Sequence, residues 1–398
     1  MSIPDLYSVY PGQNGTCDGR RTVSGGDKVA AYPNSVPYPR PEWRSGRGRR
    51  KQPIRVVHVG PSFVCAGVES WLRAMTSHCD PYVLRFVRNV VTEDYAVDHD
   101  LLQKAGIPFS FGRDKAVREA ALEADVVLVW GNVEPKYLHP DGSRAKVVFV
   151  AHGVGEWTRS ALAMAAPVVD HVVAVSSVVR EKVCVGFPTS VILNGVDQRH
   201  IACRESRDEM RRRLGFSQDD FIVGFSGRFS PEKNAHVVIE ACERLQPGAK
   251  ALMVGWGPLR YELMDLCNEL IPGRFAFATA SDFLGDYYQV MDALCMPSEA
   301  EGFGLVAAEA MLHGVPVVST QVGIAHELFN HRVNGMLCQA KPNDVSENLL
   351  LLQQNRDWAR GVGEQGRQSA LKYCLASTMA RRYEQLLESL VDGKAIGV

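Results

Sequence analysis

Short apolar runs alternate with amphipathic stretches along the chain from residue 54 onward. The run IRVVHVG at 54–60 is rich in β-branched residues and ends in glycine, which predicts a strand buried on both faces. Further runs of this kind occur at 82–87, 126–130, 146–151, 171–175 and 190–194. Helical patterns fall between most of them, at 68–78, 115–124 and 177–183. Strands that alternate with helices predict βαβ units and a parallel sheet.

A second series of the same kind begins after residue 200. Its predicted strands lie at 221–227, 251–255, 274–278, 293–297, 316–320 and 335–338. Its predicted helices lie at 208–215, 236–245, 260–270 and 305–314, and the segment 343–391 is helical without strands, ending in a helix at 377–391. The pattern therefore predicts an α/β protein with two doubly wound units joined near 195–205. Ligands of such folds bind outside the carboxyl ends of the strands, so we expect the site in the cleft between the units.

The first 52 residues differ from the rest of the chain. They are rich in Gly, Pro, Ser, Tyr and Arg, show no apolar period, and end in a segment, 40–51, with six cations against the single acid Glu42. This composition predicts a disordered or loosely draped tail. Its basic end could contact an anionic membrane. The alternative, a solubilising linker without a partner, is the favoured interpretation.

Composition restricts the class of protein further. The 398 residues suffice for two cores, and 44 Lys and Arg against 45 Asp and Glu give a net charge of −1. A balanced chain has no general attraction to nucleic acid, so no nucleic-acid partner is expected. Without a long apolar run or a secretory signal, we expect a cytoplasmic protein, with peripheral contact at the inner membrane face left open. The ten cysteines form no CxxC pair and are expected to be buried, reduced thiols.

The segment 293–320 carries the strongest chemical signal. A predicted strand leads into the loop SEAEGFG and then a helix from about Leu305, with Glu301 and Glu309 on either side of the turn. Eight helical positions span about 12 Å and about 80° of rotation. Paired hydrolase carboxylates lie about 5–10 Å apart, so this pair fits two parts of one long ligand better. The free amides at 303–306 favour an anion, and Gly302 and Gly304 allow close approach of the ligand to the backbone.

The segment 221–234 is the second signal, because its strand and glycine turn precede Arg228 and Lys233. A guanidinium fork and an ammonium at the carboxyl end of one strand suit a diphosphate, the alternative being ordinary charges on a surface turn. His152 follows the strand at 146–151 and is expected to face the cleft, unless it is a structural histidine. Neither a GxGxxG fingerprint nor a GxxxxGK[ST] loop is present. No histidine is assigned to a metal.

Together these motifs resemble those of the retaining glycosyltransferases of family 4, which have the GT-B fold. The resemblance runs from about 54 to 390. The motifs that carry it are SEAEGFGLVAAEAMLHGVPVVST with Glu301 and Glu309, GRFSPEK with Arg228 and Lys233, VGWGP at 254–258, LNGVD at 193–197 and AHG at His152.

The resemblance implies a set of roles for these residues. Arg228 and Lys233 would hold the diphosphate of a nucleotide-sugar donor, and Glu309 would bind the ribose hydroxyls. The other implied contacts to the donor come from Glu301, Gly302, Phe303, Gly304, Leu305 and Val306, from Gly67 in the first unit, and from His152 beside the donor sugar. His152, Glu301, Arg228 and Lys233 would form the catalytic set.

The resemblance also implies an arrangement of domains and a mechanism. An acceptor-side domain would span 53–198, a nucleotide-sugar domain 199–376, and a last helix within 377–398 would pack back on the first domain. A sugar would pass to a hydroxyl acceptor with retention, by front-face attack, with neither metal nor cofactor.

The chain departs from the family pattern in two places. The loop QVGIAHEL at 321–328 has one glycine, Gly323, where relatives often have two, and Asn234 stands where many relatives have glycine. The base, the donor sugar, the acceptor and the oligomeric state stay open. The alternatives to a transferase are a nucleotide-sugar epimerase, a phosphorylase, or a non-catalytic nucleotide-sugar-binding protein.

Overall fold

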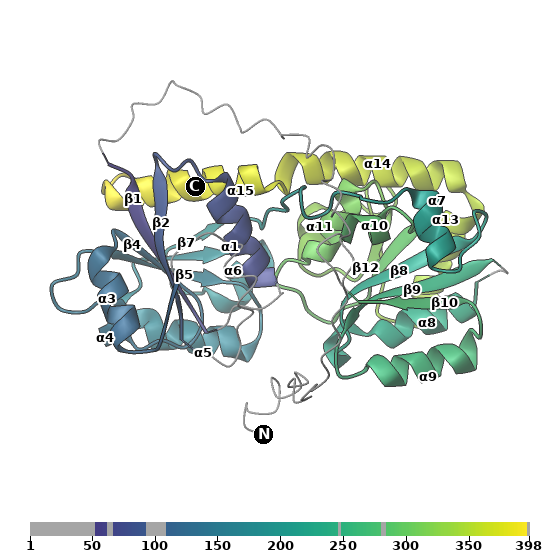
Figure 1. Ribbon diagram of the computed structural model, residues 1–398, viewed down its shortest axis with the longest axis horizontal. Coiled ribbons are helices and arrows are strands. Elements are labelled where there is room, and N and C mark those ends of the chain that lie inside the picture. Colours follow the sequence, from purple (N-terminus) through teal and green to yellow (C-terminus); the bar gives the residue numbers. More distant parts are fainter. Residues whose placement is uncertain (1–51, 62–66, 93–108, 246–247, 280–283, 396–398) are drawn as a thin grey trace, which may run out of the picture. The chain divides into compact units, whose positions relative to one another are not determined.

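The computed structural model describes residues 52–61, 67–92, 109–245, 248–279 and 284–395. The tail 1–51, with its basic segment 40–51, lies outside the described residues, and its expected behaviour stays a prediction. Residues 50–398 group into one compact unit that contains two parallel sheets (Figure 1).

The first sheet has the strand order β3-β2-β1-β4-β5-β6-β7, with every neighbouring pair parallel. Its strands are β1 (Ile54–Gly60), β2 (Leu84–Val91), β3 (Phe109–Phe111), β4 (Val126–Val129), β5 (Lys146–Ala151), β6 (His171–Ala174) and β7 (Thr189–Val191). Its helices are α1 (Gly67–His78), α3 (Lys115–Glu123), α4 (Pro135–Leu138), α5 (Glu156–Ala165) and α6 (Ser177–Val183), with a 3₁₀ turn at Ala166–Val168. The central strands are almost wholly buried, as expected for a parallel sheet covered on both faces.

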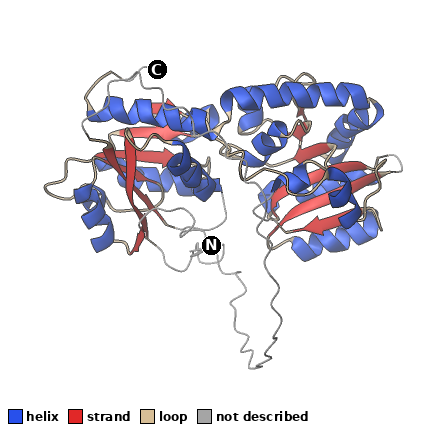
Figure 2. Ribbon diagram, turned by 45° about the horizontal axis from the view of Figure 1, so that its top comes forward, coloured by secondary structure: helices blue, strands red, loops and turns tan. Residues whose placement is uncertain are grey.

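The second sheet has the order β10-β9-β8-β11-β12-β13 and is also parallel throughout. Its strands are β8 (Phe221–Arg228), β9 (Ala249–Trp256), β10 (Phe275–Ala278), β11 (Ala293–Met296), β12 (Val317–Ser319) and β13 (Met336–Leu337). Its helices are α7 (Arg207–Arg213), α8 (Ala235–Glu243), α9 (Arg260–Leu270), α10 (Leu284–Tyr288), α11 (Leu305–Leu312) and α12 (Ile324–Leu328), with a 3₁₀ turn, η3, at Pro231–Lys233. Figure 2 shows helices beside the strands of each sheet. The order reverses between β8 and β11, which is the switch point where such sheets bind ligands.

The C-terminal segment consists of the helices α13 (Pro342–Gln354), α14 (Arg356–Tyr373) and α15 (Ala376–Val391). The helix α15 packs against α1 of the first sheet, where the rings of Tyr383 and Trp71 lie 5.6 Å apart between centroids. The Asp80 amide, just after α1, donates a hydrogen bond of 2.6 Å to Glu384. The last helix therefore contacts the first sheet, although it follows the second in the chain. The domain boundaries at 52, 198 and 376 stay predictions.

The alternating pattern predicted most elements to within two residues, and the exceptions are informative. β2 begins and ends later than 82–87, and β7 ends at Val191 instead of 194. The edge strand β3 was not predicted, since three residues with both phenylalanines exposed carry no period. Most described cysteines are buried as expected, but Cys203 is exposed. Among the described residues, no helix is long and apolar enough to cross a membrane.

Candidate functional site

The loops that follow β8 and β11 are joined by hydrogen bonds at the switch point. The Glu299 amide donates to the Glu232 carbonyl at 2.9 Å. Asn234 donates from Nδ2 to the Pro297 carbonyl at 3.2 Å. These bonds hold the two motif loops that the sequence singled out side by side at the carboxyl ends of adjacent strands.

Lys233 and Glu301 form an ion pair between the two loops at the switch point. Lys233 Nζ lies 2.7 Å from Glu301 Oε1, and the two side chains are only 23% and 11% exposed. The buried Ser298 donates a second hydrogen bond of 2.8 Å to the same oxygen. Each charge is thus paired at a site that is shielded from solvent, where electrostatic interactions are stronger than in water. The pair places an ammonium group at the switch point that can turn toward an anion.

Arg228 ends β8 and lies beside this pair in sequence. It donates from Nη2 to Glu232 Oε1 at 3.1 Å and is 45% exposed, so its guanidinium also faces solvent. The pKa of Glu232 is lowered, because hydrogen bonds from Ser230 and Arg228 outweigh the opposing effect of burial. Arg228 and Lys233 therefore both lie at the carboxyl end of β8, as the sequence predicts, each with a carboxylate partner.

Glu309 lies on α11 and is held by one tyrosine. Tyr288, which ends α10, donates its hydroxyl to Glu309 Oε2 at 2.6 Å. Burial raises the pKa of Glu309 to about 7, although the Tyr288 hydrogen bond favours the ionised form. Such a carboxyl group changes its charge close to neutral pH. Its Oε1 has no hydrogen-bond partner among the described residues.

The start of α11 leaves backbone amides available. Gly304 precedes the helix with φ +88°, a left-handed conformation that favours glycine. The first helical hydrogen bonds run from the amides of Ala307 and Ala308 to the Gly304 carbonyl. The helix therefore does not use the amides of Leu305 and Val306, in agreement with the expected anion-binding turn.

The altered loop 321–328 supports this turn. The Ile324 amide donates to the Phe303 carbonyl at 2.6 Å. Gly323 has φ +49°, and a Cβ there would collide with the same carbonyl. Ile324 itself is fully buried. The single glycine, Gly323, thus occupies the position where a side chain would collide with the backbone. Ile324, at the position where relatives often have the second glycine, packs into the core.

Two residues of the first α/β unit, His152 directly after β5 and Gly67 at the start of α1, reach the same loop. The backbone carbonyl of His152 packs so closely on Gly302 that any Cβ there would collide with it. A Cβ at Gly67 would lie 3.6 Å from Leu305 Cδ1. In this structure the close approach at Gly302 is made by the His152 backbone, a role that the sequence did not predict. His152 and Gly67 are therefore adjacent to the loop at 302–305.

Several residues of the site were missed by sequence reasoning. Ser298 lies inside the strongest motif, so its position directly after the buried strand was an available signal. Tyr288 had no signal, because it is one of two tyrosines in an ordinary amphipathic stretch. Glu327 accepts hydrogen bonds from the amide and hydroxyl of Ser177 at 2.5 and 2.6 Å. This contact joins α12 to the start of α6, and no local pattern reveals it.

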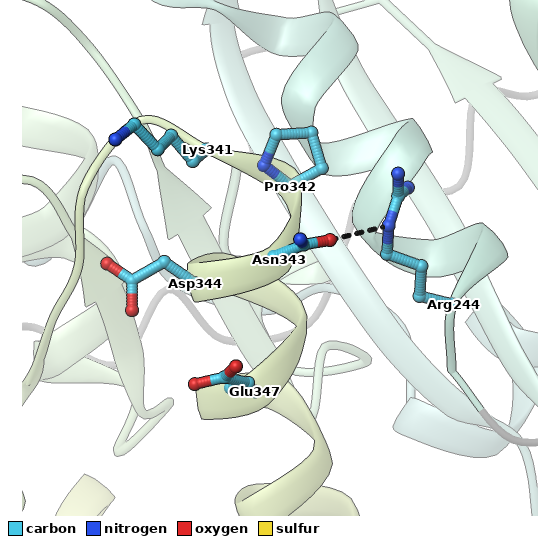
Figure 3. A pocket seen from close by; sticks show the side chains of 6 residues that line it. All are labelled: Arg244, Lys341, Pro342, Asn343, Asp344 and Glu347. Atoms are coloured by element: carbon cyan, nitrogen blue, oxygen red, sulfur yellow. Dashed lines mark hydrogen bonds between the residues drawn. The ribbon is translucent and has the colours of Figure 1, made fainter.

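Two surface pockets lie away from these residues. One, of about 420 Å³, lies between the end of α8 and the start of α13 and is drawn in Figure 3. There Arg244 Nε donates to Asn343 Oδ1 at 3.0 Å. Asp344 and Glu347 lie on the first turns of α13, beside Asn343 (Figure 3). The other, of about 530 Å³, is lined by Asp292 and by arginines of α7 and α14, among other residues. Neither contains a residue that the sequence assigned to the site.

The comparison with known families agrees with this geometry. Residues 206–369 match the family described as glycosyl transferases group 1. This part of the chain, about two fifths of its length, is similar to that family. The matched segment comprises the second sheet with both of its motif loops.

Individual relatives extend this likeness. N-acetyl-alpha-D-glucosaminyl L-malate synthase of Bacillus anthracis is 27% identical over 199 residues, which cover 49% of this chain and 52% of that protein. A GDP-mannose-dependent alpha-(1-6)-phosphatidylinositol monomannoside mannosyltransferase of Mycobacterium tuberculosis is 28% identical over 305 residues, covering 69% and 79%. For the first of these, the match spans about half the length of the curated relative.

Solved structures show the fold. HepE of Anabaena in complex with UDP superposes with a TM-score of 0.73 and 22% identity, over 84% of this chain and all of that one. The fold is therefore GT-B, with two parallel-sheet α/β domains, as the sequence predicts.

Proposed function

We propose that this protein is a retaining glycosyltransferase that moves a sugar from a nucleotide-diphosphate donor to a hydroxyl acceptor without a metal ion. The observation that carries the proposal is the Lys233–Glu301 pair, held with Arg228 at the switch point of the second sheet, within the segment similar to glycosyl transferases group 1. The names of the relatives support sugar transfer as the reaction class. The UDP complex of HepE supports a nucleotide donor.

In the proposed reaction the acceptor oxygen attacks the anomeric carbon from the face on which the donor diphosphate leaves. The bond between the anomeric carbon and the phosphate oxygen breaks, and the diphosphate departs with the electron pair. The acceptor proton passes to the leaving phosphate oxygen. Negative charge grows on the diphosphate as this bond breaks, so Arg228 and Lys233 stabilise the transition state more than the bound donor.

The remaining residues bind and orient the donor. The amides of Phe303, Gly304, Leu305 and Val306 face the phosphate, and Glu301 holds the sugar hydroxyls once Lys233 has turned to the diphosphate. Oε1 of Glu309 accepts from the ribose. Gly67 and His152 approach from the first sheet. Arg228 and Lys233 supply the positive charge that a metal would otherwise provide, so we expect activity to survive EDTA.

The deciding experiment compares Lys233→Ala with a matched control, Lys250→Ala. Lys250 pairs with Asp220 at 2.8 Å, and these side chains are 20% and 10% exposed, so burial and pairing match those of Lys233 and Glu301. Calorimetry with a panel of nucleotide sugars, including UDP-glucose, identifies the donor, and mass spectrometry identifies the product.

We expect Lys233→Ala to lower kcat about a hundredfold or more, with a smaller loss of donor affinity. Lys250→Ala should lower the melting temperature similarly and leave kcat unchanged. Arg228→Lys should also lower kcat, because an ammonium cannot reproduce the guanidinium fork. A folded Lys233→Ala protein with the kcat of the wild type would overturn the proposal. Binding without turnover would indicate a sensor, and turnover without transfer would indicate an epimerase or phosphorylase.

A further inference from the structure

A cluster of buried polar rings lies behind the site, in the first sheet. His58 is on β1 and only 2% exposed, and its Nδ1 lies 2.7 Å from Oδ1 of the buried Asn89 on β2. The ring of Trp71, on α1, lies 5.9 Å from that of His58 and 5.1 Å from that of His152. A single indole therefore contacts both imidazoles.

Two imidazole nitrogens of this cluster have no protein partner in the part of the chain that the structure describes. Nε2 of His58 and Nε2 of His152 are enclosed and have no hydrogen-bond partner among the described residues. The Trp71 indole interacts instead with the Tyr383 hydroxyl, which is enclosed beside it. An enclosed polar atom without a partner costs about 1–3 kcal/mol, so such atoms are normally satisfied by protein or by ordered water. Two unsatisfied imidazole nitrogens on rings that pack against the same indole fit a buried water, which commonly bridges such groups.

The chemistry of these atoms matches one water molecule. Because the amide oxygen of Asn89 accepts, Nδ1 of His58 carries the proton and its Nε2 is a bare acceptor. Burial lowers the pKa of His58 to about 4, against the raising effect of Asn89. Burial and the nearby His58 lower the pKa of His152 to about 3. Both imidazoles are thus neutral at pH 7. The Trp71 indole N–H can only donate.

We propose that His58 is a positioning residue that fixes the tautomer of His152 through a water molecule enclosed with Trp71. The water donates one hydrogen bond to Nε2 of each histidine, beside the Trp71 ring. His152 is then held with its proton on Nδ1, the ring nitrogen that is not enclosed. This nitrogen becomes a hydrogen-bond donor of fixed direction next to the loop at 302–305. The effect of His58 on catalysis rests on the proposed function, whereas the assignment of the His152 tautomer is independent of it.

The first test records the imidazole tautomers by long-range ¹H–¹⁵N NMR on the full chain without ligand at pH 7. His58→Phe is compared with His171→Phe as a matched control. His171 is a similarly buried histidine on β6 of the same sheet, with Nε2 3.0 Å from Ser190 Oγ. Its Nδ1 is also enclosed without a partner among the described residues. We expect His152 as a single Nδ1–H tautomer in the wild type and in His171→Phe. In His58→Phe both tautomers of His152 should appear.

His152 in the Nε2–H form, or a His152 spectrum unchanged by His58→Phe, would overturn the proposal. If His58→Phe does not fold, Asn89→Leu serves instead, because it frees the His58 ring and should mix the tautomers of both histidines. His58→Gln, whose amide oxygen can accept from the water, should keep His152 in one form. Once a donor and an acceptor that the enzyme uses are known, we expect His58→Phe to lower kcat about tenfold without changing the KM for the donor. Since the NMR readout needs no substrate, failure of the transferase proposal would leave this test valid.

Discussion

At the scale of single residues, the raised pKa of Glu309 makes the stability of the fold sensitive to pH. Its pKa is raised to about 7 by burial, against an ordinary value of 4.5. At a pH between these two pKa values, the Glu309 carboxyl is ionised in the unfolded chain but keeps its proton in the folded chain. The free energy of unfolding should therefore fall by about 3 kcal/mol as pH rises from 4.5 to about 8, and then level.

Donor affinity should change in the opposite direction, because the ionised carboxylate accepts from the ribose hydroxyls more strongly. Between pH 6 and 8 we expect affinity for a nucleotide-diphosphate sugar to rise by up to about tenfold. Both phosphates of such a donor are esterified, so they do not titrate in this range. Calorimetry across pH checks this with UDP-glucose, the ligand of one HepE complex, if it is the donor. Glu309→Gln should abolish the trend, and a trend that persists in this variant would remove the ribose assignment.

At the scale of elements, the turn from η3 into α8 depends on a left-handed residue. Asn234 has φ +50° and ψ +39°, a conformation that asparagine tolerates and alanine does not. Its side chain also bonds the Pro297 carbonyl. This explains why asparagine can replace the glycine of many relatives. We expect Asn234→Ala to lower the free energy of unfolding by about 2 kcal/mol and Asn234→Gly by less than about 1 kcal/mol. Urea unfolding measures both changes, provided that the dependence of the free energy of unfolding on urea concentration is the same in each variant. Equal free energies of unfolding for Asn234→Ala and Asn234→Gly would contradict this account.

The same scale shows what the sequence can predict. Strands and helices follow from the local period of apolar residues, and the motif loops follow from glycine, charge and their position after a buried strand. Arg228 and Lys233 lie at and just after the end of β8, and Glu301 precedes α11, as those signals predict; their roles stay predictions. The partners came from elsewhere: Tyr288 reaches Glu309 from α10. Such contacts depend on strand order and helix packing, which local patterns do not contain.

The cluster around Trp71 illustrates the same limit more strongly. Its members come from β1, β2, α1, α15 and the loop after β5, and only His152 had a signal in the sequence. In the sequence, His58 is only one polar residue within an apolar predicted strand. Its importance follows only from the enclosed atoms around it, which the folded structure brings together.

At the scale of the whole molecule, one carboxylate joins elements of the two sheets. Glu327 of α12 accepts from the amide and hydroxyl of Ser177 at 2.5 and 2.6 Å, and α12 also supports the Phe303 carbonyl through Ile324. A carboxylate at the first turn of α6 is stabilised by free amides and by the helix dipole. Because hydrogen bonds to charged groups contribute about 1.5–3 kcal/mol, this contact favours the arrangement in which His152 meets Gly302.

We therefore expect Glu327→Gln to loosen the start of α6 while leaving the core of each sheet intact. Hydrogen exchange should speed up by about tenfold or more at the Ser177 amide and in α6, since about 1.4 kcal/mol of lost stabilisation corresponds to a tenfold change. The control is Glu364→Gln, an exposed glutamate of α14 whose partners, Arg367 and Gln368, lie in the same helix. Exchange in β5 and β8 should not change in either variant. Unchanged exchange at Ser177 in Glu327→Gln would show that the two sheets are held together without this contact.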